Sequence, residues 1–143
     1  MPPRTPAGDS RRIIVADEDP KVVAFILKTL REDGHAVFHA YDGLAAMELI
    51  FASERIDLVI TDTRVAGLPG IQLVHEIRRS RPDLPMLYIA NIDRSTPAIE
   101  SKLPRDVPIL REPFTANDVR SMVGPLLTAE RGLPVNMGPT LRE

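Results

Sequence analysis

The stretch IIVADEDP at residues 13–20 joins a short hydrophobic run to a cluster of acids and a helix start. Its first four residues have the apolar, β-branched character of a strand that is buried on both faces. Asp19 is a good helix N-cap, and Pro20 suits the first helical position. Apolar residues then recur at helical spacing from Val22 to Leu30, and Gly34 suits a left-handed turn after the helix. The stretch therefore predicts one strand followed by one helix.

The same strand–helix unit recurs along the chain and predicts an α/β fold with a doubly wound parallel sheet. Right-handed crossovers leave two common strand orders, and both place ligands beyond the carboxyl ends of the strands. We expect strands at Arg12–Ala16, Ala36–Ala40, Asp57–Thr61, Met86–Asn91 and Val107–Arg111. We expect helices between Asp19 and Gly34, at Leu44–Ala52, at Gly70–Ser80, at Pro97–Lys102 as one or two turns, and from Ala116 to about Leu127, where Pro125 should bend or end the helix.

Composition limits the class of protein. The chain has 143 residues, 14 prolines, three lysines, no cysteine and a formal net charge of −2. Zero cysteines exclude disulfides, Cys-based zinc sites and a thiol nucleophile, and the charge gives no broad attraction to nucleic acid or membrane. No apolar run is long enough to span a bilayer. We expect a cytoplasmic protein with a disordered lead at 1–10, one domain at 11–128 and a flexible tail at 129–143.

Acidic residues follow the expected strands. Asp17, Glu18 and Asp19 come after the first strand, Asp62 after the third and Glu112 after the fifth. Parallel strands end at one edge of a sheet, so these carboxylates should converge as hard oxygen ligands of the kind Mg²⁺ takes. Each also has a simpler explanation. Asp19 is most simply a helix cap, Asp17 and Glu18 suit a helix first turn, and Asp62 could be a turn residue.

These segments resemble the receiver domain of bacterial two-component response regulators. The resemblance rests on IIVADEDP, DLVITDTRVAGLPG, MLYIAN and ILREPF, and it covers about Arg11 to Leu127. The segment PMLYIANI is similar, more narrowly, to an alphaproteobacterial subfamily with a shortened fourth helix. The resemblance implies a flavodoxin-like, five-stranded sheet of order 2-1-3-4-5.

The resemblance also implies roles for individual residues. Asp62 would be the phosphoacceptor, and Asp17 and Glu18 would hold Mg²⁺ together with Asp62 and the backbone carbonyl of Arg64. The phosphoryl group would come from a histidine kinase or phosphotransfer protein. The acyl phosphate on Asp62 would then hydrolyse and so time the signal.

Three positions depart from the family pattern, all on the side that reads the phosphoryl group. Ala90, before Asn91, stands where a hydroxyl residue is expected, Glu112 where a lysine is expected, and Ile109 where an aromatic residue is usual. Two unit charges about 4 Å apart interact by roughly 4 kcal/mol at an effective dielectric near 20, so Glu112 should repel what a lysine would attract. Glu112 could instead bind the metal. Arg64 could reach toward a phosphoryl oxygen or simply be solvated.

We expect a stand-alone, non-enzymatic response regulator that signals by binding a downstream protein. The resemblance also allows a homodimer through the face of the fourth and fifth helices. An alternative is a pseudo-receiver that binds its partner without phosphorylation. A remote alternative is a haloacid-dehalogenase-like phosphatase, with Asp17 as nucleophile and Asp19 as general acid, although its later motifs are not visible.

Overall fold

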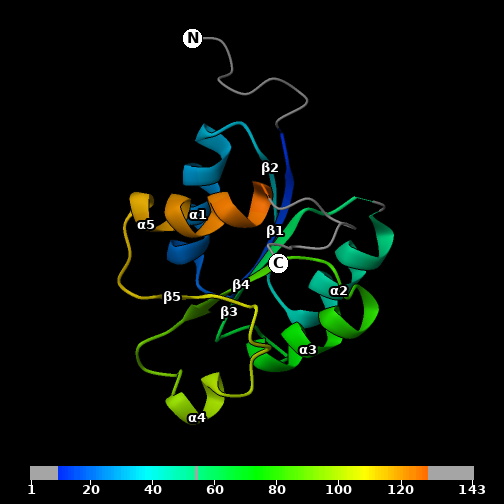
Figure 1. Ribbon diagram of the computed structural model, residues 1–143, viewed down its shortest axis with the longest axis vertical. Helices are drawn as coiled ribbons and strands as arrows, with labels where there is room; N and C mark the ends of the chain where they lie inside the picture. Colours follow the sequence, from blue (N-terminus) through cyan, green and yellow to red (C-terminus); the bar gives the residue numbers. More distant parts are fainter. Residues whose placement is uncertain (1–9, 54, 129–143) are drawn as a thin grey trace, which may run out of the picture.

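The computed structural model describes residues 10–53 and 55–128, through which strands and helices alternate (Figure 1). The strands are β1 (Arg12–Ala16), β2 (Ala36–Ala40), β3 (Leu58–Asp62), β4 (Met86–Ala90) and β5 (Ile109–Arg111). The helices are α1 (Pro20–Glu32), α2 (Gly43–Ala52), α3 (Gly70–Ser80), α4 (Pro97–Glu100) and α5 (Ala116–Thr128). The alternation and the short fourth helix agree with the sequence prediction.

All five strands are parallel and lie in the order β2-β1-β3-β4-β5, which confirms the flavodoxin-like arrangement. Ala16 pairs with Thr61 at the ends of β1 and β3, and Asp62 pairs with Ile89 on β4. The chain order reverses between β1 and β3, because β2 lies on one side of β1 and the later strands on the other. Ligands of such sheets bind beyond the carboxyl ends of the strands at this reversal.

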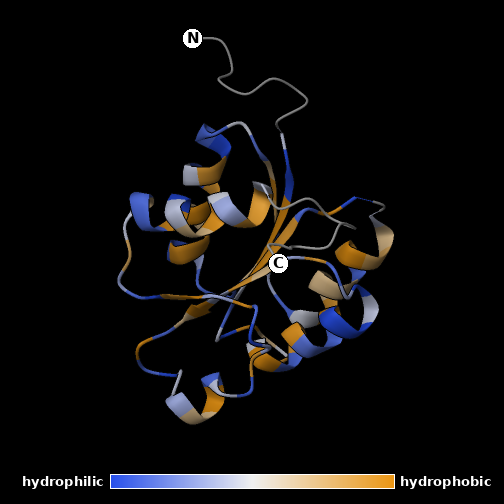
Figure 2. Cartoon of the chain, in the orientation of Figure 1, coloured by the Kyte–Doolittle hydropathy of each residue, from blue (hydrophilic) through white to orange (hydrophobic). Residues whose placement is uncertain are grey.

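The sheet separates two apolar cores. In Figure 1, α1 and α5 cover one face and α2 and α3 cover the other. Alternate residues of β1 enter the two cores: Ile13 and Val15 pack on the side of α1 and α5, and Ile14 and Ala16 on the side of α2 and α3. Hydrophobic colouring is concentrated on the strands and on the inner helix faces (Figure 2). Burial on both faces explains why the strands are apolar at nearly every position.

Three strands differ from their predicted bounds by one or two residues. β3 is Leu58–Asp62 rather than Asp57–Thr61, β4 ends earlier than predicted and β5 begins later. β4 ends at Ala90 because the Asn91 side chain turns the chain, its Oδ1 accepting a hydrogen bond from the Asp93 N–H at 3.0 Å. β5 begins at Ile109 rather than Val107, since Val107 donates to the Pro104 carbonyl in a turn and Pro108 has no N–H to give.

The prediction that Pro125 bends or ends the last helix is wrong about an end, because α5 continues through Pro125 to Thr128. A proline ring normally clashes with the Cβ of the residue before it when that residue is helical. That residue is Gly124, which has no Cβ, so the helix continues without the clash. Leu127, beyond the proline, is buried in the core beside α1.

The expected lead and tail lie almost wholly outside the described residues. Ser10, assigned to the lead, is described, and its hydroxyl donates to the Gly34 carbonyl at 3.0 Å. Gly34 has a φ of 91°, the left-handed conformation expected after α1. Within the described ranges, no helix is both long enough and apolar enough to cross a bilayer.

Candidate functional site

Two carboxyl groups meet at the ends of the central strands. Asp17 follows β1 and Asp62 is the last residue of β3, and both side chains are fully buried. The two strands are paired neighbours, which brings the carboxyl groups close enough to affect each other's titration. The structure therefore brings together the two acids that were predicted to meet at this edge of the sheet.

Each carboxylate has one oxygen held by the main chain and one without a donor. Asp17 Oδ1 accepts from the Asp19 N–H at 2.8 Å, and Asp62 Oδ1 accepts from the Arg64 N–H at 2.9 Å. Asp17 Oδ2 and Asp62 Oδ2 are buried and have no hydrogen-bond donor. Buried acceptors without partners are costly, and two such oxygens at the ends of neighbouring strands favour a bound cation.

Burial and mutual repulsion alter the titration of this pair. Burial, followed by the hydrogen bond to Asp62 and its charge, raises the pKa of Asp17 to about 9. Burial also raises the pKa of Asp62, against the opposing effects of the Asp17 bond, the Arg64 N–H and the Arg64 charge. In the absence of a cation, the two carboxyl groups thus share one proton, and they keep it at pH values well above those at which a carboxylic acid usually ionises.

The donor set fits Mg²⁺, which commonly uses one or two carboxylates and completes its shell with water and phosphate oxygens. Asp17 and Asp62 supply the carboxylates. Glu18 is exposed, and its backbone N–H donates to the Arg64 carbonyl at 3.2 Å. Among residues 10–53 and 55–128, no group of three or more acidic or histidine side chains is arranged so that it could hold a metal ion by itself. The metal roles of Glu18 and of the Arg64 carbonyl therefore remain predictions.

Thr63, in the loop after β3, is hydrogen-bonded to the end of β4 and to Asn91. The Thr63 hydroxyl donates to the Ile89 carbonyl at 2.9 Å and accepts from the Asn91 N–H at 3.1 Å. Ala90 carries no hydroxyl, and its methyl group packs in the core on the side of α2 and α3 together with the partly buried Ile109. Thr63 thus fixes the β4 end beside Asp62. The sequence reasoning missed this residue, although its position directly after Asp62 was a visible signal.

Glu112 approaches the pair from the end of β5. Its Oε2 is buried without a hydrogen-bond partner, and its carboxylate accepts a hydrogen bond from the Asn91 side chain. Burial raises the pKa of Glu112, and the negative charge of Asp62 raises it further. The structure therefore brings a third carboxyl group within electrostatic reach of Asp62, where the family pattern has a cation.

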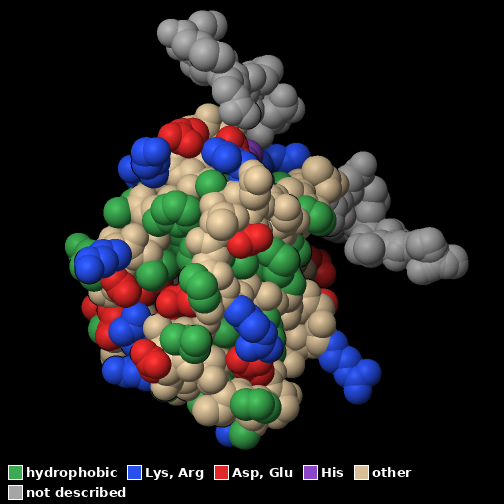
Figure 3. Space-filling model, turned by 90° about the vertical axis from the view of Figure 1, so that its left-hand side faces the viewer, with side chains coloured by type: hydrophobic (Ala, Val, Ile, Leu, Met, Phe, Trp, Pro, Cys, Tyr) green, Lys and Arg blue, Asp and Glu red, His purple; other side chains and the backbone are tan. Residues whose placement is uncertain are grey.

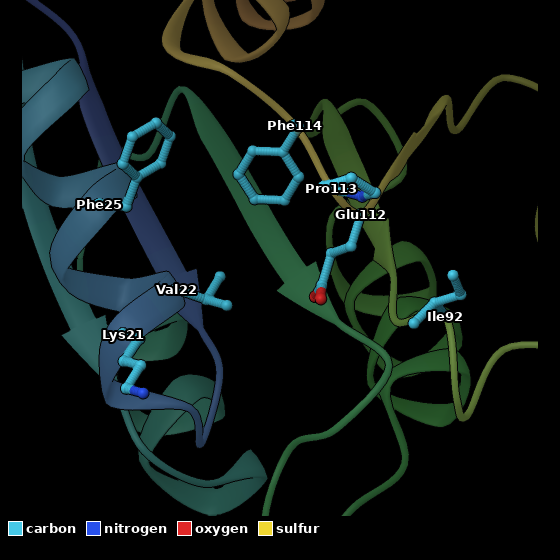
Figure 4. A pocket seen from close by; sticks show the side chains of 7 residues that line it. All are labelled: Lys21, Val22, Phe25, Ile92, Glu112, Pro113 and Phe114. Atoms are coloured by element: carbon cyan, nitrogen blue, oxygen red, sulfur yellow. The ribbon is translucent and has the colours of Figure 1, made fainter.

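A pocket of about 350 Å³ lies beside Glu112 (Figure 4). Lys21, Val22 and Phe25 on α1 form one side of it, and Glu112, Pro113 and Phe114 form the other. The rings of Phe25 and Phe114 lie 5.9 Å apart between centroids. Figure 4 shows the Glu112 side chain reaching from the end of β5 toward the end of the central strand.

Asp19 and Arg64, whose backbone N–H groups bind Asp17 and Asp62, form an ion pair with each other. Asp19 Oδ1 caps α1 by accepting from the Lys21 N–H at 2.9 Å, as predicted, and its Oδ2 lies 3.0 Å from Arg64 Nη2. The Arg64 side chain is only 24% exposed. Of the two interpretations of Arg64, the structure contradicts the solvated loop arginine. This pairing could not be predicted from sequence, because its two partners lie 45 residues apart.

Comparison with known proteins identifies relatives along most of the chain. Residues 13–123 match the response regulator receiver domain. The response regulator receiver protein CpdR of Brucella abortus is 29% identical over 83% of this chain and 98% of its own length. The response regulator MprA of Mycobacterium ulcerans is 34% identical over 59% of this chain, which spans only 36% of that protein. A solved receiver domain of a Francisella response regulator is 26% identical, covers 82% of this chain and 97% of its own, and superimposes with a TM-score of 0.70.

Proposed function

Since the chain belongs to the family of response regulator receiver domains, we propose that it accepts a phosphoryl group on Asp62. Receiver domains are in general signalling modules rather than enzymes. They typically bind Mg²⁺ at an acidic pocket and interact with histidine kinases or phosphotransfer proteins. The family match, together with the nearly full-length similarity to CpdR, supports phosphotransfer signalling over the pseudo-receiver alternative and gives no support to the phosphatase alternative.

The observation that carries the proposal is the buried pair of Asp17 and Asp62. The Arg64 N–H holds Asp62 Oδ1, which leaves Oδ2 as the oxygen without a donor. Asp17 would hold Mg²⁺ with Asp62, and Glu18 and the Arg64 carbonyl would complete the shell through direct or water-mediated contacts. When bound, Mg²⁺ offsets negative charge on the transferring oxygens.

The reaction balances as a simple displacement. An Asp62 carboxylate oxygen attacks the phosphorus of a phosphohistidine, the P–N bond breaks, and the histidine nitrogen keeps the electron pair and takes up a proton. Thr63 and the Arg64 N–H hold the β3 end in place during this step. Hydrolysis of the resulting acyl phosphate returns the Asp62 carboxylate and ends the signal.

The proposed partners are proteins, with a cytoplasmic histidine kinase or phosphotransfer protein as donor and a downstream protein as target. Acidic and basic side chains are interspersed on the face in Figure 3, with no continuous basic patch on that face for nucleic acid. Arg120 on α5, for example, lies 2.9 Å from Asp33 and 3.3 Å from Glu32.

The face of α4 and α5 is the surface expected for a homodimer. We also assign the protein no catalytic turnover of its own beyond self-phosphorylation and hydrolysis.

The proposal is tested by locating the modified residue. The protein is incubated with Mg²⁺ and acetyl phosphate and then reduced with borohydride, which converts an aspartyl phosphate to homoserine. Peptide sequencing should find homoserine at position 62, and Asp17→Asn protein should contain much less of it. Homoserine at the position of another aspartate would show that this other residue is the phosphoacceptor. Its absence from protein treated with the cognate kinase would favour the pseudo-receiver alternative.

A further inference from the structure

The proposed site has an excess of negative charge before any phosphoryl group arrives. Asp17, Asp19, Asp62 and Glu112 all act electrostatically within it. A phosphoryl group adds further negative charge, and no lysine follows a strand end to offset it. Lys21 lies across the pocket on α1, opposite Glu112 (Figure 4). A bound Mg²⁺ would offset part of this negative charge, and a cationic side chain close to Asp62 would offset more of it.

Arg64 is held where such a cation is needed. Its backbone N–H is bonded to Asp62 Oδ1 at 2.9 Å, and its guanidinium is anchored by Asp19 Oδ2 at 3.0 Å. The positive charge of Arg64 lowers the pKa of both Asp62 and Glu112 against the effect of burial. The guanidinium is thus within electrostatic reach of the nucleophile and of the extra carboxylate at the same time.

The guanidinium also has donors to spare. Arg64 Nε is buried and has no hydrogen-bond partner, and the contact to Asp19 uses Nη2 alone. Arg64 lines a second pocket of about 360 Å³, together with Glu18, Thr63 and Arg94. A planar guanidinium with free donors recognises phosphate oxygens in pairs, which an ammonium group cannot do with the same geometry.

We propose that Arg64 is a catalytic residue that binds the phosphoryl oxygens on Asp62, supplying from the β3–α3 loop the positive charge that the end of β5 does not supply. This inference rests on the proposed phosphorylation of Asp62. Arg64 donates hydrogen bonds to non-bridging oxygens and transfers no proton, so the balance of the displacement is unchanged. Asp19 positions the guanidinium and offsets its positive charge. The phosphoryl group on Asp62 then competes with Asp19 for the guanidinium.

The test measures the affinity of the protein for beryllofluoride, a phosphoryl analogue, in the presence of Mg²⁺. Arg64→Gln removes the charge but leaves both backbone contacts of residue 64, and it should weaken binding at least tenfold. Arg64→Lys should recover part of the loss, because it restores the charge without the paired donors. Arg105→Gln, which removes an exposed arginine from the loop between α4 and β5, is the control and should change the affinity less than threefold.

A second variant tests the proposal without removing the guanidinium. Asp19→Asn keeps the acceptor that caps α1 and weakens the hold on Arg64, so beryllofluoride should bind more tightly. That gain should largely disappear when Asp19→Asn is combined with Arg64→Lys. An unchanged affinity in Arg64→Gln, or an equal gain from Asp19→Asn in both backgrounds, overturns the role of Arg64 while leaving the proposed function standing. Failure of the wild-type protein to bind beryllofluoride contradicts both.

Discussion

The start of α3 lies directly against Asp62, since a Cβ added at Gly70 would be 2.1 Å from the carbonyl oxygen of Asp62. The same Cβ would be 3.3 Å from the Cα of Thr63. These are backbone atoms, which cannot rotate away as a side chain can. The absence of a side chain at residue 70 is therefore a condition for the position of Asp62 at the end of β3.

We expect Gly70→Ala to displace the end of β3 and to destabilise the protein by about 1–3 kcal/mol, as overpacking of a tight site does. Magnesium binding should weaken with it, because the two carboxyl groups no longer meet. Gln72→Ala, an exposed change on the same helix, is the control and should stay within about 0.5 kcal/mol. Chemical denaturation with and without Mg²⁺ measures both effects. A Gly70→Ala protein with wild-type stability would contradict the close contact.

Asp17→Asn should stabilise the metal-free protein. The asparagine keeps the Oδ1 acceptor for the Asp19 N–H and removes the repulsion between two buried carboxyl groups. We expect a gain of about 1–3 kcal/mol in the free energy of unfolding, in the range of other buried-charge effects. Asp83→Asn, which changes an exposed loop acid, should have no such effect.

The same variant should lose its response to magnesium. A ligand at ten times its dissociation constant stabilises the folded state by about 1.4 kcal/mol, and this increment should appear in the wild-type protein only. Thermal melts at several Mg²⁺ concentrations measure it. An equal shift in both proteins would place the metal elsewhere.

Changing Glu112 should strengthen phosphoryl binding in a graded order. The glutamate is half-buried, and its charge acts on Asp62, so Glu112→Gln removes a repulsion and Glu112→Lys replaces it with an attraction. We expect beryllofluoride affinity to rise from wild type to Gln to Lys, by at least tenfold overall, which is about 1.4 kcal/mol. Glu48→Gln, an exposed acid on α2, is the control. The reverse order would mean that Glu112 serves as a metal ligand.

The contribution of His35 to the stability of the protein should fall as the pH is lowered through the range in which His35 titrates. The Arg11 N–H donates to His35 Nδ1 at 3.2 Å, which requires a neutral ring at that nitrogen. Burial lowers the pKa of His35, as does the charge of Arg11, while Asp33 and Asp57 oppose the shift. Below about pH 6.5 the unfolded chain takes up a proton that the folded protein does not, so folding loses stability there.

This loss should be well below the limit of about 1.4 kcal/mol per pH unit for one proton, since the ring is partly exposed and solvent screens it. His35→Gln, which cannot protonate, should become more stable relative to the wild-type protein as the pH falls from 7 to 5.5. Denaturant titrations across this range measure the difference. Identical slopes in the two proteins would show that His35 titrates alike in both states.

The fold could be read from sequence because local and long-range preferences agree. Asp19 and Pro20 start α1, Gly34 ends it, and the hydrophobic strands fit a sheet buried on both faces. The end of α5 could not be read in the same way. Pro125 alone predicts a break, and only the packing of Leu127 against the core, with Gly124 before the proline, reverses that expectation.

The site was predictable to the extent that it depends on strand ends. Asp17 and Asp62 meet because parallel strands finish at one edge, which a sequence pattern can indicate. The ion pair of Arg64 with Asp19 depends on the path of the β3–α3 loop in three dimensions. Glu18 belongs to the same acidic run as Asp17 but is exposed, since successive residues after a strand point in different directions.

The most direct measurement is the intact mass of the protein after incubation with Mg²⁺ and a small phosphodonor, with Asp62→Asn treated in parallel. Phosphorylation of Asp62 predicts one phosphoryl group on the wild-type chain, dependent on Mg²⁺, and none on the variant. A wild-type chain that stays unmodified even with its cognate kinase, or a variant that is modified equally, would contradict it.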